Sequence, residues 1–217
     1  MGSTAEGPAP SGRRERNPRG QGDRLRADVV EALARLVSDD ERMRPVSVSL
    51  RELAREAGVT APAIYRHFAS VDEVAWAVAL DGFARLVATM DEAVAEAGAG
   101  TGAARLIALA QAYCRFATEN RGHFRLMFGV EPTLFGVPRE VEPPALELVE
   151  RWRRATSALR DDGVAVGDVD SAAMYLWTAV HGRLVLSPLI SSVWELGDVH
   201  RFVERLVGEI VRVGGKR

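Results

Sequence analysis

Residues 49–68, SLRELAREAGVTAPAIYRHF, carry the start and stop signals of two short helices. Ser49 can cap the first helix, because its hydroxyl can accept the Glu52 backbone N–H while the Glu52 carboxylate reaches back to the cap amide. Gly58 tolerates the left-handed conformation in which many helices end. The pattern therefore predicts a short helix that stops at Gly58.

The second helix is predicted to begin directly after this turn. Thr60 can cap it, and Pro62 falls in its first turn, where a missing backbone N–H costs little. The helix is expected to run to about His67 or Phe68. Two short helices joined by a tight turn form a helix-turn-helix, here at about residues 47–68, whose second helix can enter the major groove of DNA.

Helices are also predicted on both sides of this motif. Apolar residues recur at helical spacing from Leu25 for about 15 residues, and the pattern breaks at Pro45. Ser70 and Glu73 form a second capping box, which opens a helix to about Glu96. The first three helices form the predicted DNA-binding head.

The rest of the chain also shows helical periodicity, and no stretch has the alternation of a β-strand. Glycines at 98–102 follow a helical pattern rather than a strand, so they indicate an interhelix loop and not a phosphate-binding loop. The prolines of 131–144 indicate another loop. Further helices are predicted at about 101–120, 145–159, 168–187 and 198–213, with a shorter helix after the first of these that contains the aromatic cluster at 123–128.

The predicted fold is all-α, with about nine helices in an N-terminal head and a larger C-terminal body for ligand binding and dimerisation. We expect a disordered tail at 1–21, a helix-turn-helix domain at 22–69 and the body at 70–217. The tail is rich in Gly, Pro and Arg and holds almost no large apolar side chain, so it cannot bury enough surface to order itself.

Composition limits the function classes. The chain has 217 residues, a formal net charge of −2 and one cysteine, Cys114. The net charge alone predicts no nucleic-acid partner, and the lone cysteine excludes an intrachain disulfide. We expect a cytoplasmic protein with no membrane segment, because no leader or long apolar run is present. No catalytic or metal-ligand motif was found, so no enzyme activity, metal or cofactor is predicted.

Residues 50–68 resemble the TetR family of bacterial regulators, through the Ala57-Gly58-Val59-Thr60 turn and the Tyr65-x-His67-Phe68 end. The resemblance implies a helical protein that dimerises through its last two helices and houses a ligand pocket. The residues that it and the motif suggest for DNA contact are Ser49, Thr60, Ala61, Pro62, Ala63, Tyr65, Arg66 and His67.

Several of these contacts have specific expectations. Thr60 is either a helix cap or a phosphate contact. The small side chains at 61–63 favour contact with thymine methyl groups and readout of DNA shape over hydrogen bonds to bases. The sequence has Val71 where the family often has a phosphate-contacting Lys, so Arg24, Arg26 or the arginine tail would have to replace that contact.

A second resemblance lies in the body. Trp177-Thr178-Ala179-Val180-His181-Gly182, with residues 113–117 and 120–128, is similar to the TetR subgroup named for a Trp-His-Gly motif. Trp177 and His181 are four residues apart and share a helix face. The candidate ligand-binding residues are Tyr113, Phe116, Phe124, Met127, Phe128, Trp152, Trp177 and His181; each could instead be ordinary core, and His181 either core or ligand contact.

The function predicted from the sequence is a homodimeric repressor. The helices at about 168–187 and 198–213 would pair across the twofold axis, because a monomer would leave part of the apolar face of the last helix exposed. The dimer would bind a palindromic operator with half-sites about 34 Å apart. A small apolar or aromatic ligand would release it. A regulator without a small-molecule effector and, more distantly, an all-α enzyme with a vestigial head remain alternatives.

Overall fold

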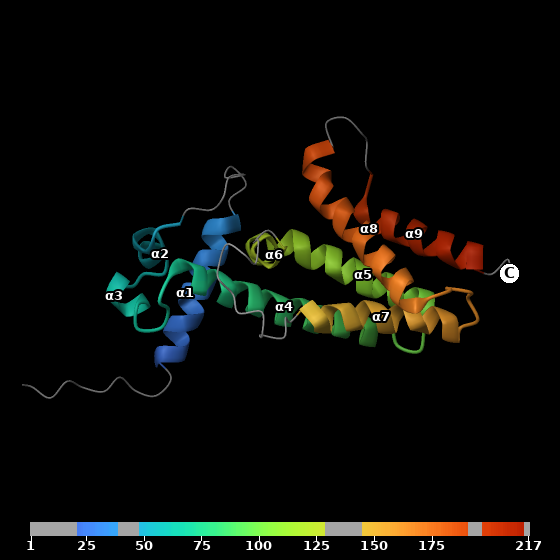
Figure 1. Cartoon of the computed structure of the whole chain (residues 1–217), viewed down its shortest axis with the longest axis horizontal. Helices are drawn as coiled ribbons and strands as arrows, with labels where there is room; N and C mark the ends of the chain where they lie inside the picture. The colour runs from blue at the N-terminus through green and yellow to red at the C-terminus, as the bar shows by residue number, and fades with distance from the viewer. Residues whose placement is uncertain (1–20, 39–47, 129–144, 191–196, 215–217) are drawn as a thin grey trace, which may run out of the picture.

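The computed structural model describes residues 21–38, 48–128, 145–190 and 197–214, and within these ranges it contains nine helices and no strand. The molecule is elongated, with α1, α2 and α3 at one end and α8 and α9 towards the other (Figure 1). The helices are α1 Gln21–Ser38, α2 Leu50–Glu56, α3 Ala61–Ile64, α4 Val71–Glu96, α5 Gly102–Glu119, α6 Arg121–Phe128, α7 Ala145–Asp161, α8 Val169–Ile190 and α9 Val199–Gly214.

The head is built on its own hydrophobic core. Leu33 of α1, Leu53 of α2 and Ile64 of α3 are almost fully buried, and Phe68 after α3 completes the same cluster. Apolar residues at helical spacing along α1 therefore bury one face against the short helices, as the sequence pattern predicted.

Helix α4 belongs to two cores. Its first half, from Val74 to Val78, packs in the head cluster, and its second half, from Ala79 to Ala93, packs in the body cluster. Leu126 of α6 also joins the head cluster. Head and body therefore share α4 and α6, so movement in either core can be passed along these two helices.

The body packs around α5, which contacts α4, α7, α8 and α9. Tyr113 and Leu106 of α5 are fully buried, and Trp152 of α7 is 1% exposed. Helix α8 crosses α5 and α7 diagonally (Figure 1). No helix within the described ranges is both long and apolar enough to cross a membrane.

Of the three predicted helix caps, the structure confirms one in full and one in part, and it contradicts the third. Ser49 and Glu52 form the full capping box, with the Glu52 N–H donating to Ser49 Oγ at 3.2 Å and the Ser49 N–H donating to the Glu52 carboxylate at 2.9 Å. Ser70 caps α4, but the Glu73 carboxylate accepts the Ala69 N–H instead of completing the box. Thr60 occupies the cap position of α3 without a side-chain hydrogen bond, so the prediction of a Thr60 side-chain cap is wrong.

Some helix boundaries differ from the prediction. Helix α1 begins at Gln21, four residues before Leu25, and α3 ends at Ile64. Residues 65–67 form a turn, in which the His67 and Phe68 N–H groups both donate to the Ile64 carbonyl. The predicted loop at 131–144 and almost all of the predicted tail lie outside the described residues.

Candidate nucleic-acid interface and aromatic cluster of the body

The turn between α2 and α3 is short and well bonded. The Val59 N–H donates to the Ala54 carbonyl at 2.9 Å, and Gly58 has a φ of +67°, a conformation that a side chain would strain. The two helices are thereby held as a helix-turn-helix at the far end of the molecule from α9 (Figure 1).

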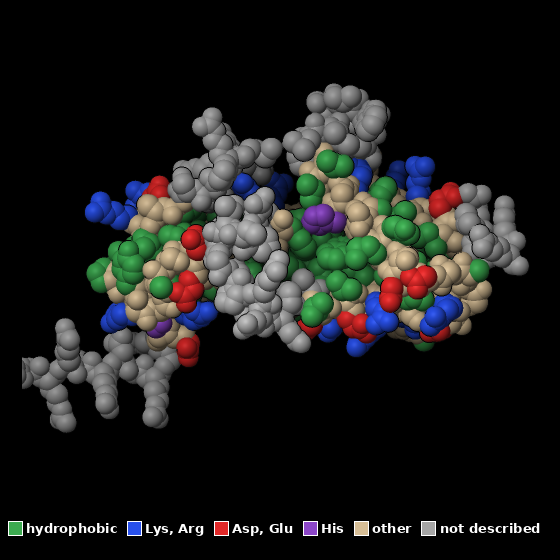
Figure 2. Space-filling view, viewed as in Figure 1, with side chains coloured by type: hydrophobic (Ala, Val, Ile, Leu, Met, Phe, Trp, Pro, Cys, Tyr) green, Lys and Arg blue, Asp and Glu red, His purple; other side chains and the backbone are tan. Residues whose placement is uncertain are grey.

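Most predicted DNA-contacting residues lie on the surface of this end. Tyr65 is 58% exposed, and the other exposed members of the set are Arg24, Ser49, Thr60, Pro62 and Arg66. Figure 2 shows Lys and Arg side chains around the same end. A solvent-exposed surface with cationic side chains is what contact with a phosphate backbone requires.

Three other predicted positions have less free surface. Ala63 is only 8% exposed, which leaves little of its side chain available for the predicted apolar contact with DNA. Ala61 is half-buried against the head core. His67 is also half-buried and lies beside Gly22 of α1, where an added Cβ would come within 3.3 Å of the imidazole ring.

Val71 lies where the family often has a phosphate-contacting lysine, and its surroundings are apolar. Val71 packs on the head core. The Arg26 guanidinium lies over the Phe68 ring at 4.6 Å from its centroid, a cation–π contact. Arg24 is exposed at the start of α1, so it is the candidate replacement with the freer side chain.

In the body, six of the eight predicted ligand residues form one aromatic cluster. Ring contacts join Tyr113 to Phe124, Phe128, Trp152 and His181 at centroid distances of 5.7, 6.4, 5.8 and 6.3 Å. Trp177 contacts Phe128 at 6.4 Å, and His181 contacts Phe128 at 4.7 Å. The space-filling view shows hydrophobic side chains gathered over α5 and α8 around a hollow, with a histidine at its edge (Figure 2).

The other two predicted ligand residues lie deeper in the same core. Phe116 is 2% and Met127 is 8% exposed. Neither makes a ring contact with the cluster within the described residues, and Met127 lies against Gly82 of α4. They support the cluster from behind more than they line its hollow.

Burial sets the protonation of the polar groups in this cluster. The Tyr113 hydroxyl lies 2.7 Å from His181 Nδ1. Burial raises the pKa of Tyr113 far above its ordinary value and lowers the pKa of His181, so the phenol is protonated and the imidazole neutral at pH 7. The hydroxyl therefore donates to Nδ1, which leaves the imidazole proton on Nε2. Burial likewise raises the pKa of the Cys114 thiol to about 12, which keeps this cysteine unreactive.

A charged cluster joins the head to the body. Arg85 of α4 donates to Glu31 of α1 at 2.9 Å and to Asn120, at the end of α5, at 2.8 Å. Its guanidinium also lies 3.5 Å from Asp81 and 3.3 Å from His123 Nε2. Burial, and then the Arg85 charge, lower the pKa of His123. One residue thus connects α1, α4, α5 and α6.

Glu31, Asp81 and His123 also have the side chains of a metal site. Their potential ligand atoms lie within 4.8 Å of one another. The Arg85 guanidinium lies among them and supplies the positive charge that the two carboxylates require. The arrangement is therefore complete as an ion-pair cluster.

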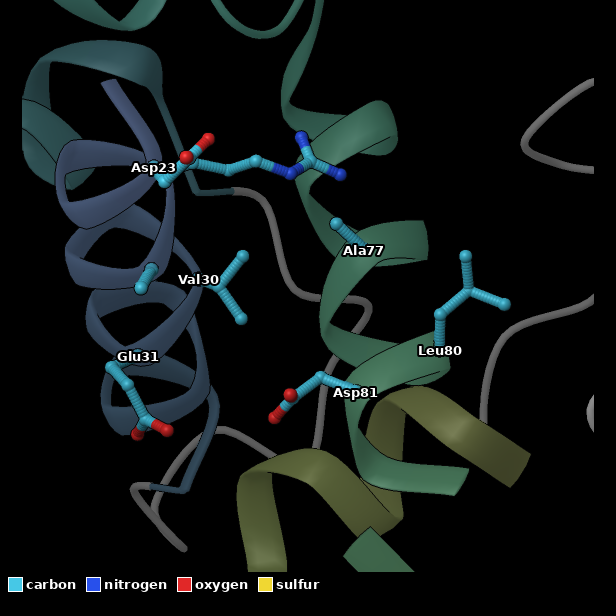
Figure 3. Close-up of a pocket in the computed structure, with 8 residues that line it drawn as sticks. Asp23, Val30, Glu31, Ala77, Leu80 and Asp81 are labelled. Atoms are coloured by element: carbon cyan, nitrogen blue, oxygen red, sulfur yellow. The ribbon is translucent and has the colours of Figure 1, made fainter. Parts of the chain in front are cut away.

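A groove of about 450 Å³ separates α1 from α4 beside this cluster (Figure 3). Its apolar wall includes Val30, Ala77 and Leu80, and Asp81 points from α4 towards α1. The charged residues Glu31 and Asp81 therefore lie at the edge of this groove, next to apolar residues of the head core.

Sequence reasoning missed Arg85 and Gly122. The partners of Arg85 come from four helices, and no local pattern brings them together. Gly122 lies against α1, where an added Cβ would be 1.9 Å from the Ala34 carbonyl oxygen. A glycine inside a helical pattern was the available signal, since such a residue often marks a close approach.

The most exposed apolar residues of the C-terminal helices lie on α8. Val203 and Val207 of α9 are buried, whereas its other apolar residues are only partly buried on the body core, so part of the apolar face of α9 is exposed, as expected. On α8 the exposed large apolar residues are Met174, Tyr175, Val185 and Leu186, at 50, 74, 48 and 48%. An added Cβ at Gly182, between them, would meet no atom within 4 Å.

These features define a helix-turn-helix protein with an all-helical body. Residues 46–78 match the family model described as bacterial regulatory proteins, tetR family, and residues 106–210 match the model described as tetracyclin repressor-like, C-terminal domain. Both models describe the same family, one covering the helix-turn-helix and the other the body. The chain belongs to the TetR family of bacterial regulators.

Individual relatives agree with this assignment. HTH-type transcriptional regulator Mb1846 of Mycobacterium bovis is 28% identical over 148 residues, which are 68% of this chain and 60% of that relative. A protein of unknown function from Rhodococcus sp. RHA1 is 27% identical, with a TM-score of 0.71 over 91% of this chain and 98% of that one. A tetR-family regulatory protein from Rhodococcus RHA1 shares the fold, at 18% identity and a TM-score of 0.60, over 89% and 96%.

Proposed function

We propose that this protein is a dimeric repressor that binds a palindromic operator through residues 49–68 and is released by a small apolar or aromatic molecule. The observation that carries the proposal is the exposed surface of the helix-turn-helix. There the capped helix α2 and the tight turn at Gly58 hold Thr60, Pro62 and Tyr65 outward at one end of the molecule. The body motif that ends at His181-Gly182 supports placing the chain in the Trp-His-Gly subgroup.

The part of this surface that could read the DNA sequence is small. Thr60 is free to contact a phosphate, because its hydroxyl makes no capping bond. Arg66 and Tyr65 supply further contacts to the DNA backbone, and Arg24 replaces the missing lysine. Pro62 offers only apolar contact, so readout of DNA shape carries much of the specificity.

The dimer interface in this proposal is the exposed apolar face of α8, with α9 beside it. Tyr175, Gly182 and Leu186 are spaced to lie along one side of α8. Gly182 has no side chain and has open space in front of it, so two copies of α8 can approach closely there. A twofold axis through this face places the two heads on the same operator.

The proposed effector site is the aromatic cluster, and α6 is the connection to the head. Phe124 and Phe128 of α6 contact His181, whereas Gly122 lies on the backbone of α1. The Arg125 guanidinium donates to the Val37 carbonyl of α1 at 2.8 Å. A molecule that displaces α6 therefore also shifts α1, and operator and effector must lower each other's affinity.

Selection of bound fragments from random duplex DNA tests this proposal. We expect a pseudo-palindromic consensus whose half-sites lie about 34 Å apart, which is one turn of DNA, or slightly more. Enrichment of a single asymmetric half-site would contradict the dimer geometry. No enrichment at all would contradict DNA-specific binding.

A further inference from the structure

Two tryptophans of the aromatic cluster have buried, unpartnered hydrogen-bond donors. Trp152 of α7 is 1% exposed and Trp177 of α8 is half-buried. The indole Nε1 atom of each is inaccessible to solvent and has no hydrogen-bond partner among the described residues. Buried tryptophan N–H groups ordinarily find an acceptor, because an unmade hydrogen bond is costly. The two indole N–H groups therefore meet no acceptor in hydrogen-bond geometry within the part of the chain that the structure describes.

Both tryptophan side chains lie next to Tyr113. The Trp152 ring packs edge-on against Tyr113, with centroids 5.8 Å apart. The Trp177 indole N–H lies close enough to the Tyr113 hydroxyl to act on it as a hydrogen-bond donor, which lowers the pKa of Tyr113 against the larger effect of burial, although the contact is too poorly aligned to count as a formed hydrogen bond. The hydroxyl itself donates to His181, whose Nε2–H is a further donor.

The cluster also lacks formal charge. Burial lowers the pKa of His181, so this imidazole is neutral at pH 7. Trp152, Trp177 and Tyr113 carry no charge at pH 7. A carboxylate or an ammonium group placed here would lose its hydration, and none of these four side chains carries an opposite charge.

We infer that the effector is a neutral, largely apolar molecule with a hydrogen-bond acceptor such as a ketone, ester or amide oxygen, which accepts from the indole N–H groups of Trp152 and Trp177. This inference rests on the proposed effector site. It excludes free carboxylates and organic cations as the preferred class, and it assigns the specificity to two tryptophans whose N–H groups are otherwise unused.

Four naphthalene probes that differ in one group test the inference. They are 2-acetylnaphthalene, 2-ethylnaphthalene, 2-naphthoate and 2-naphthylmethylammonium, each titrated into the full-length ¹⁵N-labelled protein. The chain has four tryptophans, so the indole N–H region of the NMR spectrum is simple. The ketone should bind about tenfold more tightly than the hydrocarbon, since one hydrogen bond distinguishes them. It should also shift the Trp152 or Trp177 indole proton downfield.

Tryptophan variants assign the effect to the donors. Trp177→Phe should weaken binding of the ketone about tenfold and leave binding of the hydrocarbon unchanged. Trp152→Phe should do the same, and it is the second measurement because its complete burial puts folding at risk. Trp76→Phe is the matched control: Trp76 is a partly buried indole on α4, outside the ring contacts of the cluster, and its loss should change neither affinity.

Several outcomes would overturn the inference. These are tighter binding of the carboxylate or the ammonium probe than of the ketone, equal binding of ketone and hydrocarbon, or no binding of any probe. Downfield, exchange-protected Trp152 and Trp177 protons in the free protein would also overturn it, because the donors would already be used. None of these readouts involves DNA. A chain that selects an operator but ignores the ketone contradicts only this inference, and the reverse result contradicts only the DNA-binding proposal.

Discussion

At the scale of single residues, burial lowers the pKa of the two histidines of the body, His123 and His181. His123 is 4% exposed between Asp81 and Arg85, and His181 lies against three aromatic rings. Burial is the largest cause of the lowered pKa of each. Both are therefore neutral in the folded protein at pH 7 and resist protonation as the pH falls.

Stability should accordingly fall with decreasing pH between about 7.5 and 5.5. In this window the unfolded chain takes up protons near the ordinary histidine pKa of 6.5, while the folded protein, with its lowered pKa values, takes up fewer. The free energy of unfolding then decreases by at most about 1.4 kcal/mol per pH unit for each histidine. Urea unfolding at several pH values measures this slope.

The variant His123→Gln/His181→Gln should flatten that profile. The window stays above pH 5.5 because Asp168 and Asp198 also have lowered pKa values, and their protonation reduces stability at more acidic pH. A wild-type profile that is already flat from pH 7.5 to 5.5 would be incompatible with buried, neutral histidines.

At the scale of elements, α6 is the shortest helix of the body and has two functional sides. Phe124 and Phe128 contribute to the aromatic cluster, whereas Gly122 and Arg125 contact the backbone of α1. His123 adds the link to Arg85 and Asp81. Since α6 has only eight residues, we expect a shift on the side of the aromatic cluster also to move the side that contacts α1.

Gly122→Ala should disturb this contact directly. The new methyl group would be 1.9 Å from the Ala34 carbonyl oxygen and 2.7 Å from Ser38 Oγ, so α6 must move away from α1. We expect a loss of about 1–3 kcal/mol in the free energy of unfolding, as for other overpacked sites. The neighbouring exposed variant Glu119→Ala is the control and should change stability by no more than about 0.5 kcal/mol. Equal stability of the two variants in denaturant titration would show that the approach is not close.

At the scale of the whole molecule, the helix-turn-helix and the exposed face of α8 lie towards opposite ends (Figure 1). A dimer built on α8 therefore leaves both helix-turn-helix surfaces free. The aromatic cluster, our proposed effector site, lies in the body core, and α4 and α6 contribute residues to both the body core and the head core.

Tyr175→Glu should separate the dimer. Tyr175 is 74% exposed in the protomer, so a charge there leaves the protomer intact but meets its symmetry mate at an apolar twofold interface. We expect a monomer at micromolar concentration in sedimentation velocity. Ala104→Glu adds the same charge at an exposed position of α5 and should remain dimeric. If Tyr175→Glu sediments as a dimer, α8 is not the interface.

Local signals predicted the helices well and long-range contacts poorly. The Ser49 capping box and the turn at Gly58 depend on neighbours within four residues, and the structure confirms both. The hydroxyl of Thr60 makes no cap, which depends on its exact orientation and not on residue type. Arg85 could not be found, because its partners converge only when α1, α4, α5 and α6 pack together.

In the candidate sites too, sequence patterns identified many of the residues but not how they pack. The resemblance to the family pointed to the aromatic residues, and the structure joins six of them in one cluster. Burial of Ala63 could not be predicted, since a small residue in a short helix has no periodic pattern to place it. The periodic pattern of α9 predicted its apolar face, and the body core covers this face only in part.

The affinity of the selected consensus duplex for wild-type protein and for Tyr65→Ala/Arg66→Ala tests the central claim most directly. Both side chains are exposed, so the variant should unfold at the same temperature as the wild type. Fluorescence anisotropy should show at least about tenfold weaker binding by the variant. Its log K against log salt slope should be about two units shallower, because each protomer loses one phosphate contact at Arg66. Arg160→Ala, an exposed substitution on α7, should bind as the wild type does. Unchanged affinity and salt dependence in the double variant would contradict the assignment of residues 49–68 as the DNA-binding surface.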